Sequence, residues 1–219
     1  MMRFFPFFSF LILFSCALDE KEASLPYIGN YDLEYSTKDG ENHVDTIYQP
    51  IREFTYLNQD SIAVTNNTYK NKIWVTEFFF ATCPTICPIM NGEMALLQRE
   101  IKALGGDAQV QFLSFTIDPS KDSPAALKKH KSLYCESCLN WDFLTGNEDF
   151  THRLGIESFK VFAGREAEAE GGYAHSGAFS LVDRSGFLRG VYNITDFDGT
   201  VNKNEYHRLK RDISLLLKP

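Results

Sequence analysis

Two cysteines separated by three residues follow a strongly apolar segment, and this arrangement constrains the chain more than any other feature. The segment 73–80 is apolar at all but two positions, which is typical of a strand buried on both faces. Cys83 and Cys87 come directly after it, and large apolar residues then recur at helical spacing over residues 90–104, before Gly105. The cysteine pair is therefore predicted to lie where a strand turns into a helix.

A helix that begins near Cys87 favours the thiolate form of both cysteines. The first turn of a helix carries free N–H groups and the positive end of the helix dipole, which stabilise an anion. The thiolate is the form that binds metal ions and attacks disulfides. Since residues four apart share one helix face, Cys83 and Cys87 can hold a single ion if the turn between them is helix-like. We therefore predict a reactive dithiol; a purely structural disulfide is the alternative.

The composition describes one globular domain. The chain has 219 residues, of which 44% are hydrophobic and 14% aromatic, and this is enough for a well-filled core. The formal net charge is −7 and the sequence pI about 5.3, which argues against nucleic acid as a partner.

The N-terminus has the features of an export signal. Arg3 precedes an apolar run over residues 4–14 that is shorter than the roughly 20 residues of a membrane span. The tetrapeptide that ends at Cys16 resembles the bacterial lipoprotein cleavage box, so we predict a signal peptide over residues 1–15 and lipidation of Cys16. An ordinary signal peptide with an incidental cysteine is the alternative. In either case the domain is expected outside the cytoplasm, on the periplasmic side of the cell envelope.

The remaining periodicities predict a single α/β domain over residues 44–219, preceded by a tether and lead-in over residues 16–43. Predicted strands are 44–48, 54–57, 110–117 and 141–145, predicted helices are 124–134, 148–154 and 206–217, and a hairpin is predicted over 177–192. Parallel strands joined by helices, with reactive thiols at the first helix, predict a thioredoxin-like fold. The expected architecture is a central mixed sheet flanked by helices, with an N-terminal β extension and a C-terminal hairpin plus helix.

Several motifs, in this order, resemble the Sco/SenC family of copper-binding, thioredoxin-like proteins. They are Phe-Phe-Phe-Ala-Thr-Cys-Pro-Thr-Ile-Cys-Pro-Ile-Met at 78–90, Phe-Leu-Ser-Phe-Thr-Ile-Asp-Pro at 112–119, Trp-Asp-Phe-Leu-Thr-Gly at 141–146, Gly-Gly-Tyr-Ala-His-Ser-Gly at 171–177 and Leu-Val-Asp-Arg-Ser-Gly at 181–186. The similarity covers roughly residues 45–217. A lone Cys-x-x-x-Cys is a weak signal, whereas the ordered set is specific.

The resemblance implies a copper site formed by Cys83, Cys87 and His175. It also implies a role in assembling the dinuclear copper centre of cytochrome c oxidase subunit II, with that subunit or another copper-accepting protein as partner. Asp118 matches a family position near the site and is carried over as a residue that lines the site or as a weak ligand.

The three residue types suit copper chemically. Thiolates are soft ligands that favour Cu(I), and imidazole also suits Cu(II). The alternative function is that of a thiol-disulfide oxidoreductase that reduces the copper-site cysteines of the recipient. Such enzymes usually carry Cys-x-x-Cys, so the extra residue and His175 favour a metal site.

Cys135 and Cys138 form a second close pair that we do not expect across the family. The favoured interpretation is a small structural disulfide that closes the loop after the 124–134 helix. A second redox couple that exchanges electrons with Cys83 and Cys87, or an additional metal site, are the alternatives. The remaining histidines are expected to be surface or capping residues; they are His43, His130, His152 and His207. Met90 and Met94 are expected to be core residues.

Overall fold

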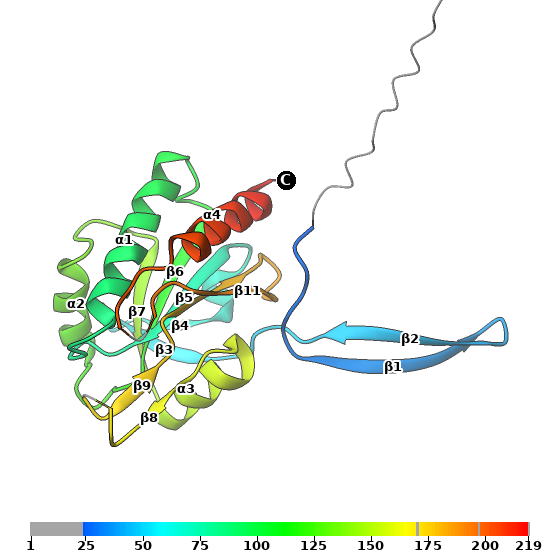
Figure 1. The fold of residues 1–219 in the computed structure, drawn as a ribbon, viewed down its shortest axis with the longest axis horizontal. Coiled ribbons are helices and arrows are strands. Elements are labelled where there is room, and N and C mark those ends of the chain that lie inside the picture. Colours follow the sequence, from blue (N-terminus) through cyan, green and yellow to red (C-terminus); the bar gives the residue numbers. More distant parts are fainter. Residues whose placement is uncertain (1–23, 170, 197, 219) are drawn as a thin grey trace, which may run out of the picture.

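The computed structural model describes residues 24–169, 171–196 and 198–218, and these form a domain around one seven-stranded sheet. The strand order is β11-β10-β5-β6-β7-β3-β4, with β5, β6 and β7 parallel and the remaining neighbours antiparallel (Figure 1). The strands are β3 (Thr55–Asn58), β4 (Ala63–Thr65), β5 (Ile73–Phe79), β6 (Val110–Thr116), β7 (Trp141–Thr145), β10 (Ala178–Val182) and β11 (Leu188–Asn193). The predicted thioredoxin-like α/β architecture is confirmed.

The helices begin and end at residues that the sequence marks. They are α1 (Cys87–Ala103), α2 (Pro124–Ser132), α3 (Glu148–Leu154) and α4 (Lys203–Leu217), with short helical turns η1 (Asn66–Tyr69) and η2 (Gly155–Phe159). Ser123, Asn147 and Asn202 accept backbone N–H groups of the first turns of α2, α3 and α4. In the described part of the chain, no helix is both long enough and apolar enough to cross a membrane.

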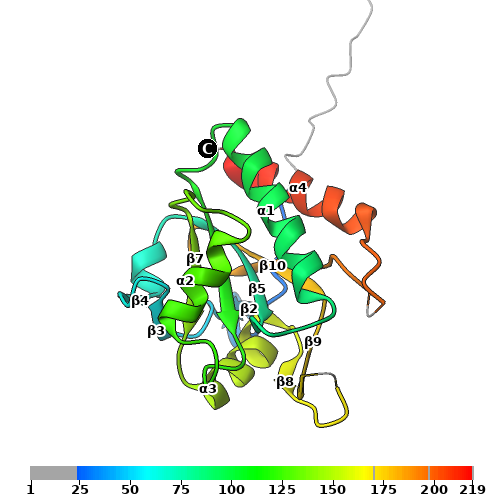
Figure 2. The same cartoon turned by 90° about the vertical axis from the view of Figure 1, so that its left-hand side faces the viewer.

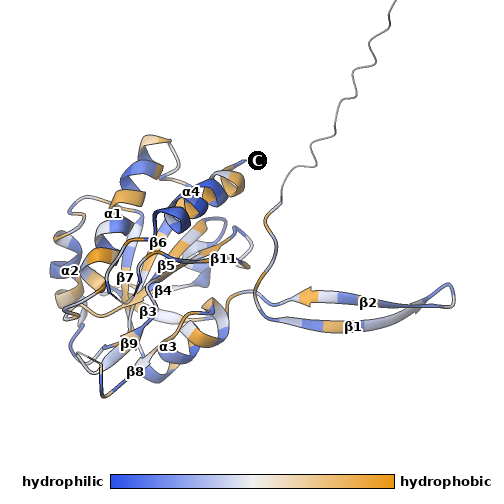
Figure 3. Cartoon of the chain, in the orientation of Figure 1, coloured by the Kyte–Doolittle hydropathy of each residue, from blue (hydrophilic) through white to orange (hydrophobic). Residues whose placement is uncertain are grey.

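The helices cover both faces of the sheet. On one face α1 and α4 lie side by side, linked by the Tyr206 hydroxyl, which donates to Glu100 over 3.0 Å (Figure 2). Hydrophilic and hydrophobic segments alternate along α4, as an amphipathic helix requires (Figure 3). On the other face η2 packs on the sheet through Phe159, whose ring lies 5.5 Å from that of Phe78. Met90 and Met94 are fully buried, which confirms their predicted place in the core.

A hairpin of β1 (Tyr31–Lys38) and β2 (Glu41–Tyr48) extends away from the domain (Figure 1). The predicted strand 44–48 is the second half of β2, so the predicted boundary at residue 44 falls inside this hairpin. Strand β1 was not predicted, although its alternation of Tyr31, Leu33 and Tyr35 with polar residues is a strand signal.

Three further features differ from the sequence prediction. Helix α3 has the predicted bounds, but Gly155 does not end the helical path: it keeps helical dihedrals, and the chain continues through the π-helical turn η2 to Lys160, which is left-handed. A small hairpin of β8 (Ala163–Arg165) and β9 (Tyr173–His175) was missed. His130 is not a surface residue: it is 9% exposed and its ring stacks on Phe79 at 5.3 Å, since α2 turns this side of its surface toward the sheet.

Candidate metal centre

The two cysteines of the 83–87 motif lie at the carboxyl end of the central strand β5. The strand ends at Phe79, and the chain turns so that the Cys83 N–H donates to the Phe80 carbonyl over 3.1 Å. Cys87 is the first residue of α1, and Pro88 follows it at a position where a helix needs no N–H donor. Both cysteines are unpaired and buried, with 8% of Cys83 and 1% of Cys87 exposed.

His175 is brought to the cysteines by the β8–β9 hairpin. It is the last residue of β9, pairs with Ala163 of β8, and is 4% exposed. Its Nδ1 lies 3.2 Å from the Ser176 carbonyl oxygen, which can only accept a hydrogen bond. Nδ1 therefore carries the proton, and Nε2 is the nitrogen that faces the cysteines.

The three side chains converge on one point. The Sγ of Cys87 lies 2.9 Å from the Nε2 of His175, although 88 residues separate them in the sequence. The Sγ atoms of Cys83 and Cys87 and a ring nitrogen of His175 all lie within 4.8 Å of one another. Among the described residues this is the only group of three or more His, Cys, Asp or Glu side chains with such spacing.

The surroundings make the two thiols chemically different. A hydrogen bond from the Cys87 thiol lowers the pKa of Cys83 to about 3, against the opposing effect of burial. Burial, and then the neighbouring Cys83 sulfur, raise the pKa of Cys87 well above its usual range. At neutral pH the pair therefore holds one proton, and this proton is on Cys87. A metal ion that displaces this proton finds two soft thiolates and one imidazole, a donor set that suits copper or zinc.

A turn over residues 118–122 contacts both segments that carry these side chains. Oδ2 of Asp122 accepts the Ala81 N–H over 3.0 Å, two residues before Cys83, and also accepts the Thr116 hydroxyl. Oδ1 of Asp118 accepts the Tyr173 hydroxyl over 3.4 Å, two residues before His175. Asp118 is not among the converging donors; its other contacts are with Ser120 and Lys121. The turn therefore positions the cysteine loop relative to β9.

Replacing Asp122 with alanine is expected to weaken both folding and metal binding. The Ala81 N–H loses its acceptor, so we expect a loss of about 2 kcal/mol in the free energy of unfolding, together with a lower metal affinity. Asp183→Ala is the matched control, because buried Asp183 holds a different turn through the Ser185 and Phe187 N–H groups. Urea unfolding and metal titration of both variants check this: an equal loss of affinity in the control would contradict a positioning role.

A buried carboxyl group lies in the strand that precedes the cysteines. Glu77 of β5 is fully buried; its Oε1 accepts the Ser114 hydroxyl over 2.6 Å, and its Oε2 has no hydrogen-bond partner. Ser114 in turn accepts the Trp141 indole N–H over 2.9 Å. Burial raises the pKa of Glu77 to about 7. The site therefore rests on a carboxyl group that is about half protonated at neutral pH.

Replacing Glu77 with glutamine is expected to change how stability depends on pH. Below about pH 4 this carboxyl is neutral whether the chain is folded or unfolded, and it carries no ionisation penalty. As the pH rises from about 4 to 7, the carboxyl loses its proton in the unfolded chain before it does so in the folded one. The free energy of unfolding of the wild type therefore falls by about 3 kcal/mol relative to that of Glu77→Gln. Urea unfolding at pH 4 and pH 8 measures this difference, with exposed Glu53→Gln as control. An equal gap at both pH values argues against the raised pKa.

Cys135 and Cys138 are joined by a disulfide, with Cα atoms 5.8 Å apart. Cys138 lines a cavity of about 310 Å³ together with Gln98 and Lys102, near the carboxyl end of α1. Cys87 is the first residue of α1, so the second cysteine pair lies toward the opposite end of this helix from the candidate metal centre.

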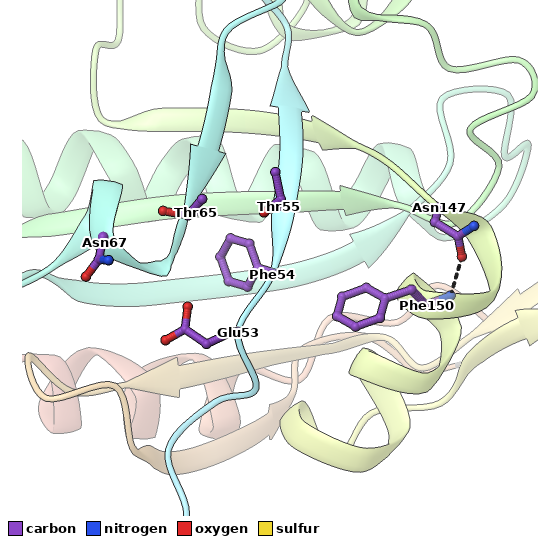
Figure 4. Close-up of a pocket in the computed structure, with 7 residues that line it drawn as sticks. All are labelled: Glu53, Phe54, Thr55, Thr65, Asn67, Asn147 and Phe150. Atoms are coloured by element: carbon purple, nitrogen blue, oxygen red, sulfur yellow. Dashed lines mark hydrogen bonds between the residues drawn. The ribbon is translucent and has the colours of Figure 1, made fainter.

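One surface cavity is lined by none of the residues of the candidate metal centre. It has a volume of about 400 Å³ and lies between β3 and the start of α3 (Figure 4). Its lining residues are Glu53, Phe54, Thr55, Thr65, Asn67, Asn147 and Phe150. Asn147 accepts the Phe150 N–H over 2.8 Å and so acts as the helix cap, which gives this residue a structural role.

The fold and the three-residue centre define a thioredoxin-like protein with a buried dithiol and a histidine in positions that could hold a metal ion. The SCO1/SenC family model matches residues 45–206, and the chain belongs to this family. The crystal structure of a SCO1/SenC family lipoprotein from Bacillus anthracis is similar, with 30% identity, a TM-score of 0.67 and coverage of 77% of this chain and 95% of that one.

Two further solved structures extend the comparison. BsSco, described as having a disulfide switch and as a member of the Sco family of cytochrome c oxidase assembly proteins, is 32% identical with a TM-score of 0.64. The similarity covers 77% of this chain and 95% of BsSco. ScoI from Bradyrhizobium japonicum, solved with copper bound, is 25% identical with a TM-score of 0.58, over 74% of this chain and 99% of that one.

Proposed function

We propose that this protein binds one copper ion through Cys83, Cys87 and His175 and delivers it to a copper-accepting protein. The observation that carries the proposal is the convergence of these three donors within 4.8 Å in a buried position. Membership of the SCO1/SenC family and the copper-bound ScoI structure support copper as the ion. We propose the dinuclear copper centre of cytochrome c oxidase subunit II as the recipient, in keeping with the assembly role given to BsSco.

The donor set suits a carrier that accepts and releases its cargo. Two thiolates and a neutral imidazole leave one net negative charge around Cu(I) and none around Cu(II), so neither oxidation state is strongly disfavoured. Three protein ligands leave one coordination position open. A ligand of the recipient can enter there before the donors of this chain release the ion.

The same two sulfurs supply a means of control. Joining Cys83 to Cys87 as a disulfide removes both thiolates and therefore removes the metal site. The compartment that we propose for this domain is oxidising, so a reductant must keep the pair reduced for copper to bind. Metal loading is then linked to the redox state of the pair.

A membrane anchor fits delivery to a membrane-bound oxidase. We propose that residues 1–15 are a signal peptide and that Cys16 is lipidated; both lie outside the described residues. The B. anthracis relative is described as a lipoprotein, which supports this proposal. The domain then works on the periplasmic side of the cell envelope.

Copper titration of the reduced protein tests the proposal. We expect one copper ion per chain by native mass spectrometry, and thiolate-to-copper charge-transfer bands when Cu(II) is added. Pre-oxidation of Cys83 and Cys87 should abolish both signals, and dithiothreitol should restore them. Binding that is weak, or that exceeds one ion per chain, would reject a dedicated copper site.

A second candidate function is that of a thiol-disulfide oxidoreductase. It is favoured by the asymmetry of the pair, since Cys83 has the lower pKa and Cys87 the higher. Cys83 would attack the disulfide of the recipient's copper site, and Cys87 would resolve the mixed disulfide. Turnover of a peptide disulfide that survives His175→Ala but stops in Cys83→Ser would favour this function over copper transfer.

A further inference from the structure

The projecting β1–β2 hairpin separates its charged side chains from its uncharged ones. Successive side chains point to opposite faces of a strand, and the pairing of Tyr31 with Tyr48 and of Lys38 with Glu41 sets which residues share a face. One face carries no charged residue: it holds Tyr31, Leu33, Tyr35, Thr37, Asn42, Val44, Thr46 and Tyr48. The opposite face holds Asp32, Glu34, Ser36, Lys38, Glu41, His43, Asp45 and Ile47.

The uncharged face is not covered by the domain. Tyr35 is 74% exposed, Tyr31 57% and Val44 54%, and the hairpin extends away from the rest of the described chain (Figure 1). A two-stranded hairpin is marginally stable by itself in water, and clustered exposed apolar side chains mark a surface that contacts something else. The hairpin therefore has the features of an interaction element.

The base of the hairpin is fixed to the domain. The Gln49 N–H donates to the Asn30 carbonyl over 2.7 Å, and the Tyr27 and Tyr48 rings stack at 5.0 Å. The guanidinium of Arg189, in β11, lies 4.1 Å from the centre of the Tyr27 ring. These contacts set the direction in which the hairpin points, so whatever binds the hairpin also orients the domain.

A second copy of the chain is a poor occupant of this face. Strands of eight residues are about 26 Å long, so one face of the hairpin covers roughly 260 Å². Two such faces would bury roughly 520 Å² in total, well below the roughly 1,000 Å² of a stable interface. The hairpin also carries five acidic side chains against one lysine, so two hairpins repel each other. The same acidity disfavours an anionic surface.

An uncharged lipid surface fits better. Tyrosine and aliphatic side chains are favoured where the acyl chains of a bilayer meet its headgroups, while an acidic opposite face stays in water. The hairpin begins seven residues after the segment 1–23, which contains the apolar run 4–14. Attachment of that segment to a membrane through Cys16 holds the start of the hairpin within about 50 Å of the lipid surface, even if the 15 residues from Cys16 to Tyr31 were fully extended.

We propose that the uncharged face of the β1–β2 hairpin lies on a zwitterionic lipid bilayer and so fixes the orientation of the copper-binding domain relative to the membrane. This inference rests on the proposed membrane attachment of the chain and is independent of copper binding. A hairpin of this size binds weakly by itself, so it acts together with the N-terminal attachment.

Hydrogen exchange of the full chain, with and without phosphatidylcholine vesicles, tests the proposal. We expect amide exchange over residues 31–48 to slow at least about tenfold with vesicles, while exchange in β5 stays unchanged. Val44→Asp places a charge on the uncharged face and should abolish this protection. His43→Asp, the same change at the neighbouring position on the charged face, should retain it. Both variants should bind copper as the wild type does. Copper titration therefore distinguishes a failure of the lipid-binding proposal from a failure of the proposed copper site.

Three outcomes would overturn the proposal. The first is unchanged exchange over residues 31–48 with vesicles, including the case in which the chain does not attach to them. The second is protection that rises with protein concentration in the absence of lipid, which would assign the face to a second copy. The third is protection that requires anionic lipid or that survives Val44→Asp.

Discussion

Cys87→Ser is expected to abolish stoichiometric copper binding while the domain stays folded. The substitution replaces a buried soft sulfur, 2.9 Å from the His175 ring nitrogen, with a hydroxyl that does not ionise at neutral pH. Removing a residue that only supports a metal ligand lowers metal affinity by about 10- to 100-fold. Because Cys87 is itself a proposed ligand, we expect copper affinity to fall by more than about 100-fold. Competition with a chelator of known copper affinity measures this change.

Two histidine variants make the same prediction specific. His175→Ala should also lower copper affinity sharply and remove the charge-transfer bands of the Cu(II) form. His152→Ala is the matched control, because His152 lies outside the converging group and its Nε2 is within 3.1 Å of the Ile117 carbonyl oxygen. Copper binding that persists in His175→Ala at wild-type affinity would contradict the three-ligand site.

Gly177→Ala is expected to be strongly destabilising. A Cβ at this position would lie 2.2 Å from the Thr195 carbonyl oxygen, a backbone atom that cannot move aside alone. The Gly177 carbonyl also accepts the N–H groups of Ile194 and Thr195, so displacement would cost these hydrogen bonds as well. We expect a loss of about 3 kcal/mol in the free energy of unfolding, measured in urea. Because His175 is two residues away, copper affinity should fall too.

Gly92→Ala is the control for this prediction. Gly92 lies inside α1, five residues after Cys87, and a Cβ there would meet nothing within 4 Å. Alanine is the better helix former, so this variant should be more stable by about 0.5–1 kcal/mol and should bind copper normally. Equal stability of the two variants would show that the close approach to Thr195 is not what requires glycine at residue 177.

Local patterns predicted the elements that carry the cysteines. The apolar run 73–80 and the helical spacing from Met90 onward correspond to β5 and α1, and β7 and α3 have the predicted bounds. These elements are visible in the sequence because each has either a continuous buried run or a clear period bounded by a cap or a glycine.

The missed elements depend on pairing across the chain. Strands β8 and β9 have three residues each, too few for a periodic signal, and they exist because they pair with each other. His130 lies among lysines in the sequence, so only the packing of α2 against Phe79 shows that its ring is buried. The contacts of Asp122 with Ala81 and Thr116 have no sequence signal at all, since they join three separate segments.

By itself, the sequence determined a thioredoxin-like α/β domain with a reactive dithiol at a strand–helix junction, and the motif order indicated the family. These are local properties, set by hydrophobic period, turn residues and the field of a helix terminus. The tertiary structure alone decided that the Nε2 of His175 meets the Cys87 sulfur across 88 residues, and that Cys138 lies near Gln98 and Lys102 of α1. Distances between segments remote in the chain depend on how the sheet and helices pack, which no local pattern encodes.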